Sequence, residues 1–317
     1  MIISASYKTD IPTFYGEWFM NRLRAGYCGM VNPYNRMPIR VSLSSDEVDG
    51  FVFWTKNIGP FMKHLPEIRS RGFPFVVQHT INAYPKSLEY AVVHAKRSVE
   101  HLHRLASDYG PRVPVWRYDT IVISTETPLD FHRSNFEALC RQLRGATDEV
   151  VISFVHLYKK TLRNMEWAAQ EFGFTWEDPS PDAKRQLATD LVQIASANGM
   201  RLSVCSQRDF IVPGAQDARC IDAERLESVA GRRIRADQRG NRKECGCFAS
   251  RDIGDYDTCP HGCVYCYAVL NRELAQQRFR EHDPAAEFLF RPSPDLKIPE
   301  PPSPRGISLP LFGQSEG

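Results

Sequence analysis

The sequence predicts an α/β protein built as a full or partial (β/α) TIM-like barrel. Short β-rich runs alternate along the chain with longer helical patterns. The β-rich runs are almost continuously apolar, which is typical of parallel strands covered by helices. Five or more such units follow one another, and 317 residues suffice for one α/β barrel. In that architecture, functional side chains lie at the carboxyl ends of the strands.

Six strands are expected, each short and rich in Val, Ile, Phe, Tyr or Thr. They lie at residues 2–6, 50–54, 73–80, 113–123, 149–157 and 201–206. One expected helix has an apolar stripe at three- and four-residue steps, formed by Leu88, Val92, Ala95, Val99 and Leu102. Further helices are expected at about 14–25, 58–71, 130–144, 160–172 and 182–198.

Two regions depart from this alternation. Residues 219–243 carry eight basic side chains and are expected to form an irregular, solvated connection. Seven prolines between Pro292 and Pro310 exclude a regular core at the end of the chain. We therefore expect a barrel over 1–283, which includes a cysteine-rich segment at 205–266, and an extended proline-rich tail over 284–317.

Charge and hydropathy limit the partners. Forty Lys and Arg against 38 Asp and Glu leave a net charge of +2, too small for the whole surface to bind a polyanion. The first residues lack the basic and apolar regions of a signal peptide, and no apolar run could span a bilayer. We expect a soluble, cytoplasmic protein without a membrane partner, in which thiols stay reduced.

Seven of the nine cysteines fall within 62 residues, which predicts metal or iron–sulfur binding rather than disulfides. Cys259, Cys263 and Cys266 have the spacing C-x3-C-x2-C. A loop of this size can place three thiolates on three irons of a 4Fe–4S cluster and leave the fourth iron open. Gly262 would allow the tight turn, and a helix is expected from about Val264 towards Gln276.

Zinc is the alternative metal for this loop, with His261 or a cysteine of the 245–247 segment as the fourth ligand. The other clustered thiols number four, which is enough for an auxiliary 4Fe–4S cluster or a zinc site, although free cysteines are also common in apolar cores. These four are Cys205, Cys220, Cys245 and Cys247. Cys28 and Cys140 stand alone in helical patterns and are expected in the core.

The cysteine spacing, with the aromatic Tyr265 before the last cysteine, resembles the radical S-adenosylmethionine (SAM) superfamily. The resemblance implies that the open iron binds SAM and that one electron cleaves it to methionine and a 5′-deoxyadenosyl radical, which abstracts hydrogen from a substrate. It also implies a reductant such as flavodoxin or ferredoxin. It places Tyr265 beside the adenine, Lys56 near the SAM carboxylate, and Thr9 and Thr80 within hydrogen-bond reach of SAM.

Segments 53–57, 80–82 and 117–119 resemble successive strand ends of the spore photoproduct lyase branch of that superfamily, and Thr9-Asp10-Ile11-Pro12 is similar to a turn after that branch's second strand. The order of these motifs fits a circularly permuted barrel, in which the strand near 247–253 and the cluster loop form the first unit. Strand 2–6 should then pair in parallel with the strand near 247–253. Thr9, Asp10 and Lys56 should share one barrel mouth with the cysteines.

Over about residues 1–280 the chain also resembles an uncharacterised bacterial family with a C-terminal cysteine cluster. No substrate is known for that family, so the resemblance does not identify one. The opening S-x-x-T-D-I-P, the F-W-T-K-N strand and the C-G-C…C-x-H-G-C-x-Y-C-Y-A ending carry this likeness.

Asp10, Arg117 and Asp119 are the candidates for substrate binding. Arg117 and Asp119 alternate along one strand and share a face, so they form either a buried ion pair or a substrate clamp. No catalytic residue is assigned. The leading hypothesis is a radical SAM enzyme with an unknown substrate. The alternatives are a radical SAM enzyme acting on nucleic acid and a non-catalytic interaction protein stabilised by zinc or a cluster.

Overall fold

An eight-stranded parallel sheet dominates the computed structural model, which describes residues 1–32, 37–240 and 244–290. The strand order is β11–β10–β8–β6–β5–β4–β1–β12, and every neighbouring pair is parallel. The strands are β1 (Ile2–Ala5), β4 (Gly50–Thr55), β5 (Phe75–Thr80), β6 (Pro114–Ile121), β8 (Glu149–Phe154), β10 (Arg201–Val204), β11 (Gln216–Asp217) and β12 (Ser250–Asp252). The predicted α/β class is confirmed, and each of the six predicted strands lies in this sheet. Within the described residues, no pairing joins the edge strands β11 and β12.

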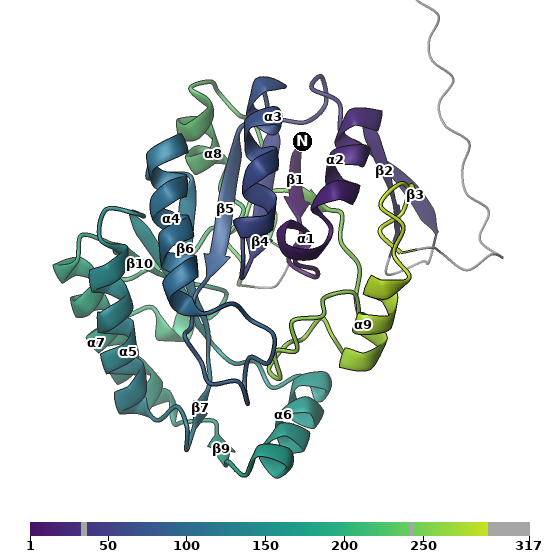
Figure 1. Cartoon of the computed structure of the whole chain (residues 1–317). Helices are drawn as coiled ribbons and strands as arrows, with labels where there is room; N and C mark the ends of the chain where they lie inside the picture. The colour runs from purple at the N-terminus through teal and green to yellow at the C-terminus, as the bar shows by residue number, and fades with distance from the viewer. Residues whose placement is uncertain (33–36, 241–243, 291–317) are drawn as a thin grey trace, which may run out of the picture.

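The helices follow the strands in sequence and pack outside the sheet, as α3, α4 and α5 do in Figure 1. They are α1 (Ile11–Phe14), α2 (Gly16–Ala25), the 3-10 helix η1 (Gly59–His64), α3 (Leu65–Ser70), α4 (Ala95–Tyr109), α5 (Leu129–Leu143), α6 (Lys159–Phe172), α7 (Pro181–Ala197), α8 (Ala223–Ala230) and α9 (Arg272–Arg280). A second short 3-10 helix, η2, covers Arg208–Phe210.

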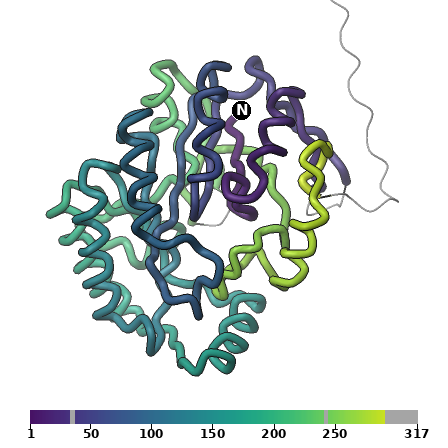
Figure 2. Tube along the Cα trace, in the orientation of Figure 1, coloured from purple at the N-terminus to yellow at the C-terminus, as the bar shows by residue number. Residues whose placement is uncertain are grey.

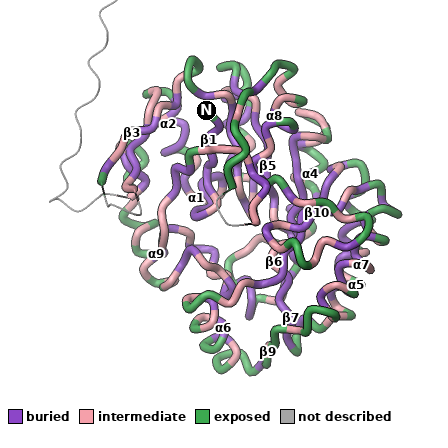
Figure 3. The backbone as a smooth tube through the Cα atoms, turned by 180° about the vertical axis from the view of Figure 1, so that it is seen from behind, coloured by how far each residue is buried: buried purple, intermediate pink, exposed green. Residues whose placement is uncertain are grey.

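Alternate residues of the strands enter two different cores. Ile3, Phe51 and Val77 pack with α2 and α3 on the outer face of the sheet. Their neighbours Ile2 and Val52 pack on the opposite face with residues of the segment 218–248. Figure 3 shows buried residues concentrated along the strands. A strand buried on both faces must be apolar at every position, which explains the continuous apolar runs.

The first and last strands of the sheet are neighbours. Ile2, Ile3 and Ser4 of β1 pair in parallel with Ser250, Arg251 and Asp252 of β12. Figure 2 shows the purple start of the chain beside the green segment that holds β12. The predicted pairing of strand 2–6 with the strand near 247–253 is confirmed. Apart from β12, the strands follow one another across the sheet in chain order.

Several smaller elements differ from expectation. The hairpin β2 (Tyr27–Val31) and β3 (Pro38–Ser42) was not predicted, because its strands are short and directly follow α2. A second small antiparallel pair joins β7 (Ile123–Ser124) and β9 (Trp176–Glu177). Cys28 and Cys140 are fully buried, as predicted, but Cys28 lies on strand β2 rather than in a helix.

Two predicted helix starts are wrong. The segment 264–271 forms turns, and α9 begins only at Arg272, where the Asn271 side chain caps it by accepting a hydrogen bond from the Leu274 N–H at 3.0 Å. Likewise, α4 begins at Ala95 rather than near Leu88. Leu88 is buried without being helical, because its carbonyl accepts the Val264 N–H at 3.1 Å and so ties this turn to the cysteine loop.

The basic connection is more ordered than a solvated loop. It contains α8, and the Arg225 side chain on α8 is almost fully buried and forms an ion pair with Glu149 at 3.0 Å. Residues 284–290, assigned to the tail from the sequence, pack on the fold: Trp18 donates to the Ala286 carbonyl at 3.1 Å, and Phe288 is buried. The tail prediction for residues 291–317 lies outside the described residues.

The carboxylate of Asp252 joins the two ends of the fold. It accepts hydrogen bonds from the Ser4 hydroxyl at 2.8 Å and the Ser6 hydroxyl at 2.7 Å, and its Oδ1 lies 3.2 Å from the Lys8 ammonium. Lys8 and Asp252 are both buried. A buried ion pair that loses one partner leaves an uncompensated charge, so this contact fixes the β1–β12 junction.

We expect Asp252→Ala to lower the free energy of unfolding by about 3–5 kcal/mol, because Lys8 would be left buried without its carboxylate. Urea unfolding followed by circular dichroism measures this change. Asp130, whose carboxylate is 93% exposed, supplies the control: Asp130→Ala should change stability by less than about 1 kcal/mol. Equal effects of the two substitutions would contradict the proposed role of Asp252.

Candidate functional site

A cavity of about 760 Å³ lies at the carboxyl ends of the parallel strands. Its wall includes residues at or just after the ends of β1, β4, β5, β6, β8 and β10. Every side chain that the sequence singles out for a cofactor, metal or substrate lines this one cavity. These are Thr9, Asp10, Lys56, Thr80, Arg117, Asp119, Cys205, Cys220, Cys245, Cys247, Cys259, Cys263, Tyr265 and Cys266.

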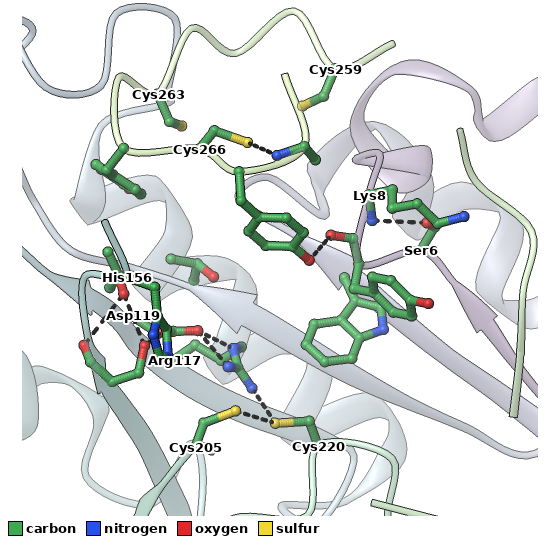
Figure 4. Close-up of a pocket in the computed structure, with 18 of the residues that line it drawn as sticks. Ser6, Lys8, Arg117, Asp119, His156, Cys205, Cys220, Cys259, Cys263 and Cys266 are labelled. Carbon is green, nitrogen blue, oxygen red and sulfur yellow. Dashed lines mark hydrogen bonds and ion pairs between the residues drawn. The ribbon is translucent and has the colours of Figure 1, made fainter. Parts of the chain in front are cut away.

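The cysteine loop forms one side of the cavity. Cys259, Cys263 and Cys266 lie together at the top of Figure 4, and none of them forms a disulfide. Gly262 has a positive φ of 72°, and a Cβ at this position would lie 2.8 Å from Arg272 Nε. Glycine therefore permits the turn that carries the thiols, as predicted.

Burial raises the pKa of Cys259 to about 12, and it also raises the pKa values of Cys263 and Cys266. Desolvation penalises the thiolate form. A cationic metal group in contact with the three sulfurs would offset that penalty, because it stabilises the thiolates directly.

The start of the chain holds the loop in place. The Thr9 hydroxyl donates to the Asp255 carbonyl at 2.7 Å and also contacts the Thr258 hydroxyl. Asp10 Oδ2 lies 2.7 Å from His261 Nε2 and accepts the Lys56 backbone N–H at 2.8 Å. These contacts confirm that Thr9, Asp10 and Lys56 share one mouth with the cysteines. They also show Thr9 and Asp10 supporting the loop.

His261 is buried, and both of its ring nitrogens face protein oxygens: Nε2 faces Asp10, and Nδ1 lies 3.4 Å from the Ala91 carbonyl. This arrangement does not favour His261 as the fourth ligand of a zinc ion. Among the described residues, no three His, Cys, Asp or Glu side chains are disposed around a single metal ion. A 4Fe–4S cluster makes a different demand, because it binds each thiolate on a separate iron.

Lys56, which is partly buried, and Glu89, which is buried, form an ion pair at 2.8 Å beside the cysteine loop. Burial alone would lower the pKa of Lys56, but the Glu89 carboxylate raises it above its ordinary value. Burial alone would raise the pKa of Glu89, yet Lys56 holds it below its ordinary value. Both groups are therefore charged, and Lys56 is not a surface lysine that extends into solvent.

Glu89 also fixes Tyr265. The Tyr265 hydroxyl donates to the Glu89 carboxylate, and Asn82 Nδ2 donates to the same carboxylate at 3.0 Å. Sequence reasoning missed Glu89 because the residue falls inside the helix predicted from Leu88. The one sequence feature that could have indicated Glu89 is its position directly after Leu88, the first apolar residue of that predicted helix.

Arg117 and Asp119 form the predicted ion pair, and both line the cavity (Figure 4). Arg117 is buried, and its Nη1 lies 3.2 Å from Gln78 Oε1 and 2.9 Å from Cys220 Sγ. The guanidinium also stacks over Trp54, 5.0 Å from the ring centroid. The ion pair is present, with Arg117 buried and Asp119 partly exposed to the cavity, and its role as a structural pair or a substrate clamp stays a prediction.

The four remaining clustered cysteines also come together. Cys205 Sγ lies 3.5 Å from Cys220 Sγ, and the Cys247 side chain lies beside those of Cys220 and Cys245. Cys205 and Cys220 lie at the bottom of Figure 4, across the Arg117–Asp119 pair from the cysteine loop. Two groups of thiols therefore face one cavity.

These features define an α/β protein with a thiol-lined cavity at the carboxyl ends of parallel strands. Residues 2–268 match a domain of unknown function, DUF1848, and the chain belongs to that family. No curated protein and no solved structure matches the chain. In the described part of the chain, no helix has the length and apolar character needed to cross a membrane.

Breaking the Lys56–Glu89 pair should destabilise the fold. We expect Glu89→Gln to cost about 1–3 kcal/mol, because it leaves the partly buried Lys56 ammonium without a counter-charge. The double variant Lys56→Met/Glu89→Gln removes both charges and should recover much of that loss. Urea unfolding of the two single variants and the double variant measures the coupling. Strictly additive losses would contradict a direct ion pair.

Proposed function

We propose that this protein is a radical SAM enzyme. Cys259, Cys263 and Cys266 would hold a 4Fe–4S cluster, and SAM would bind in the adjoining cavity. The observation that carries the proposal is the convergence of three unpaired thiols, spaced C-x3-C-x2-C, with the strand-end residues Lys56 and Thr80 around one cavity. A cavity of about 760 Å³ exceeds what a purely structural metal site needs, so we favour an enzyme over an interaction protein.

When bound, the cluster would supply the electron that cleaves SAM to methionine and a 5′-deoxyadenosyl radical. The chain's own residues supply binding and orientation. Lys56 places a cation at the mouth, where a carboxylate of the ligand can accept its hydrogen bonds. Glu89 keeps that ammonium in place and orients Tyr265.

The strand order supports a circularly permuted partial barrel as the finer description of the fold. In this description, β12, the cysteine loop and α9 form the first unit, and β1 opens the second. The permutation accounts for a cluster loop near the end of the chain while its binding partners Thr9 and Lys56 lie near the start. A reduced flavodoxin or ferredoxin in the cytoplasm is the proposed electron donor.

A second candidate is a radical SAM enzyme acting on nucleic acid. Lys8, Lys159 and Lys160 line the cavity, and Tyr7 and Trp54 offer aromatic faces there. Cations combined with aromatic faces suit a phosphate backbone and an unstacked base. Tyr15 and Trp18 are buried in the core and cannot stack on a base.

Each of Cys259→Ala, Cys263→Ala and Cys266→Ala should reduce SAM cleavage to the level without enzyme, because the cluster loses a ligand. The assay is 5′-deoxyadenosine formation by reconstituted, dithionite-reduced protein under anaerobic conditions, measured by chromatography. Cys140→Ala is the control. It removes a buried thiol that does not line the cavity, and the variant should keep the activity. Retained 5′-deoxyadenosine formation by the Cys263→Ala protein would contradict the proposal.

The nucleic-acid candidate predicts that Lys159→Ala/Lys160→Ala weakens binding of a single-stranded oligonucleotide by about tenfold or more at low salt, because two phosphate contacts are lost. Fluorescence anisotropy at several salt concentrations measures this change. Arg185→Ala, which removes a surface charge on α7, is the control. Equal affinities for the wild type and the double variant would argue against this candidate.

A further inference from the structure

We infer that Cys205, Cys220, Cys245 and Cys247 bind a second iron–sulfur cluster on the wall of the cavity opposite the cysteine loop. Four thiolates would saturate this cluster, so it would have no iron open to SAM. The inference does not depend on SAM cleavage, because none of the four residues belongs to the 259–266 loop. It deepens the proposed function by placing a second redox centre at the same cavity.

Three separate segments bring the four thiols together. Cys205 directly follows β10, Cys220 lies between β11 and α8, and Cys245 and Cys247 precede β12. Backbone hydrogen bonds fix these segments to one another. The Ala218 N–H donates to the Val204 carbonyl at 3.0 Å, and the Phe248 N–H donates to the Ile221 carbonyl at 3.0 Å. The convergence is therefore a property of the fold and not of one flexible loop.

The sulfur atoms form a continuous set without a covalent bond. The 3.5 Å between Cys205 Sγ and Cys220 Sγ far exceeds a disulfide length of about 2.05 Å, and all four cysteines are free. A disulfide would use only two of these four side chains. Cys220 and Cys247 are each 3% exposed, whereas Cys205 and Cys245 are partly exposed. The set thus combines two buried thiols with two that are partly exposed.

The surroundings suit an anionic cluster. Arg117 Nη1 lies 2.9 Å from Cys220 Sγ, and the Ile221 N–H donates to Cys247 Sγ at 3.3 Å. A buried cation and N–H groups directed at sulfur stabilise thiolate-bound clusters and tune their potentials. Zinc could use the same four thiolates, so the metal analysis below distinguishes the two.

Iron and sulfide analysis of the anaerobically purified full chain tests the inference. The wild type should hold about eight irons, and the Cys259→Ala/Cys263→Ala/Cys266→Ala variant about four, since each 4Fe–4S cluster contributes four. Cys220→Ser/Cys247→Ser should likewise hold about four, and the Cys140→Ala control about eight. Circular dichroism verifies that each variant is folded, and electron paramagnetic resonance of the reduced proteins identifies the cluster type.

Three results would overturn the inference: a folded triple variant without iron, the same variant with one zinc per chain, or a Cys205–Cys220 disulfide in alkylation mapping of the anaerobic protein. The failure of the proposed function is distinct. It would appear as wild-type protein that forms no 5′-deoxyadenosine, whatever iron the triple variant retains.

Arg117 provides a second readout in the triple-variant background. Removing a cation beside a cluster lowers the reduction potential of that cluster. In the triple variant only the second cluster is expected to remain, so Arg117→Gln should shift the potential at which its electron paramagnetic resonance signal appears to a more negative value. Arg117→Lys keeps the charge and should shift it less. Identical potentials for the two substitutions would contradict the placement of this cluster beside Arg117.

Discussion

The parallel pairing of β1 with β12, held by the buried carboxylate of Asp252, is the constraint on which the rest of the site depends. β12 leads directly into the cysteine loop, and β1 leads into Thr9 and Asp10. Joining these strands side by side brings the loop against the first residues of the chain. Because β4 pairs with the other edge of β1, Lys56 reaches the same place. One junction thus assembles a mouth from residues some 250 positions apart.

Charge in the cavity is arranged in pairs. Lys8 faces Asp252, Lys56 faces Glu89, and Arg117 faces Asp119. A buried charge is costly unless a partner compensates it, and each pair lies at the end of a different strand. The cations of these pairs stand close to thiols or the cavity, where an anionic ligand could share them. Pairing therefore keeps polar groups at the site without leaving an isolated buried charge.

The sequence predicted the strands and the set of cavity residues well, because both rest on local signals: continuous apolar runs and crowded cysteines. Contacts between distant segments were less visible. Glu89 was missed because its partners Lys56 and Tyr265 are distant in sequence. The helix expected from Val264 failed because an apolar repeat cannot reveal that Asn271 supplies the cap seven residues later. Arg225 looked solvated because its partner Glu149 lies on β8, some 76 positions earlier in the chain.

The junction of the first and last strands also orders events during synthesis. On the ribosome, β1 emerges early and pairs at once only with segments that follow it closely, whereas β12 appears about 245 residues later. Until then, one edge of β1 has no strand beside it. Contacts of such long sequence separation form slowly, and an exposed edge invites association with other nascent chains. We therefore expect the nascent chain to depend on chaperones until β12 has been synthesised and can pair with β1.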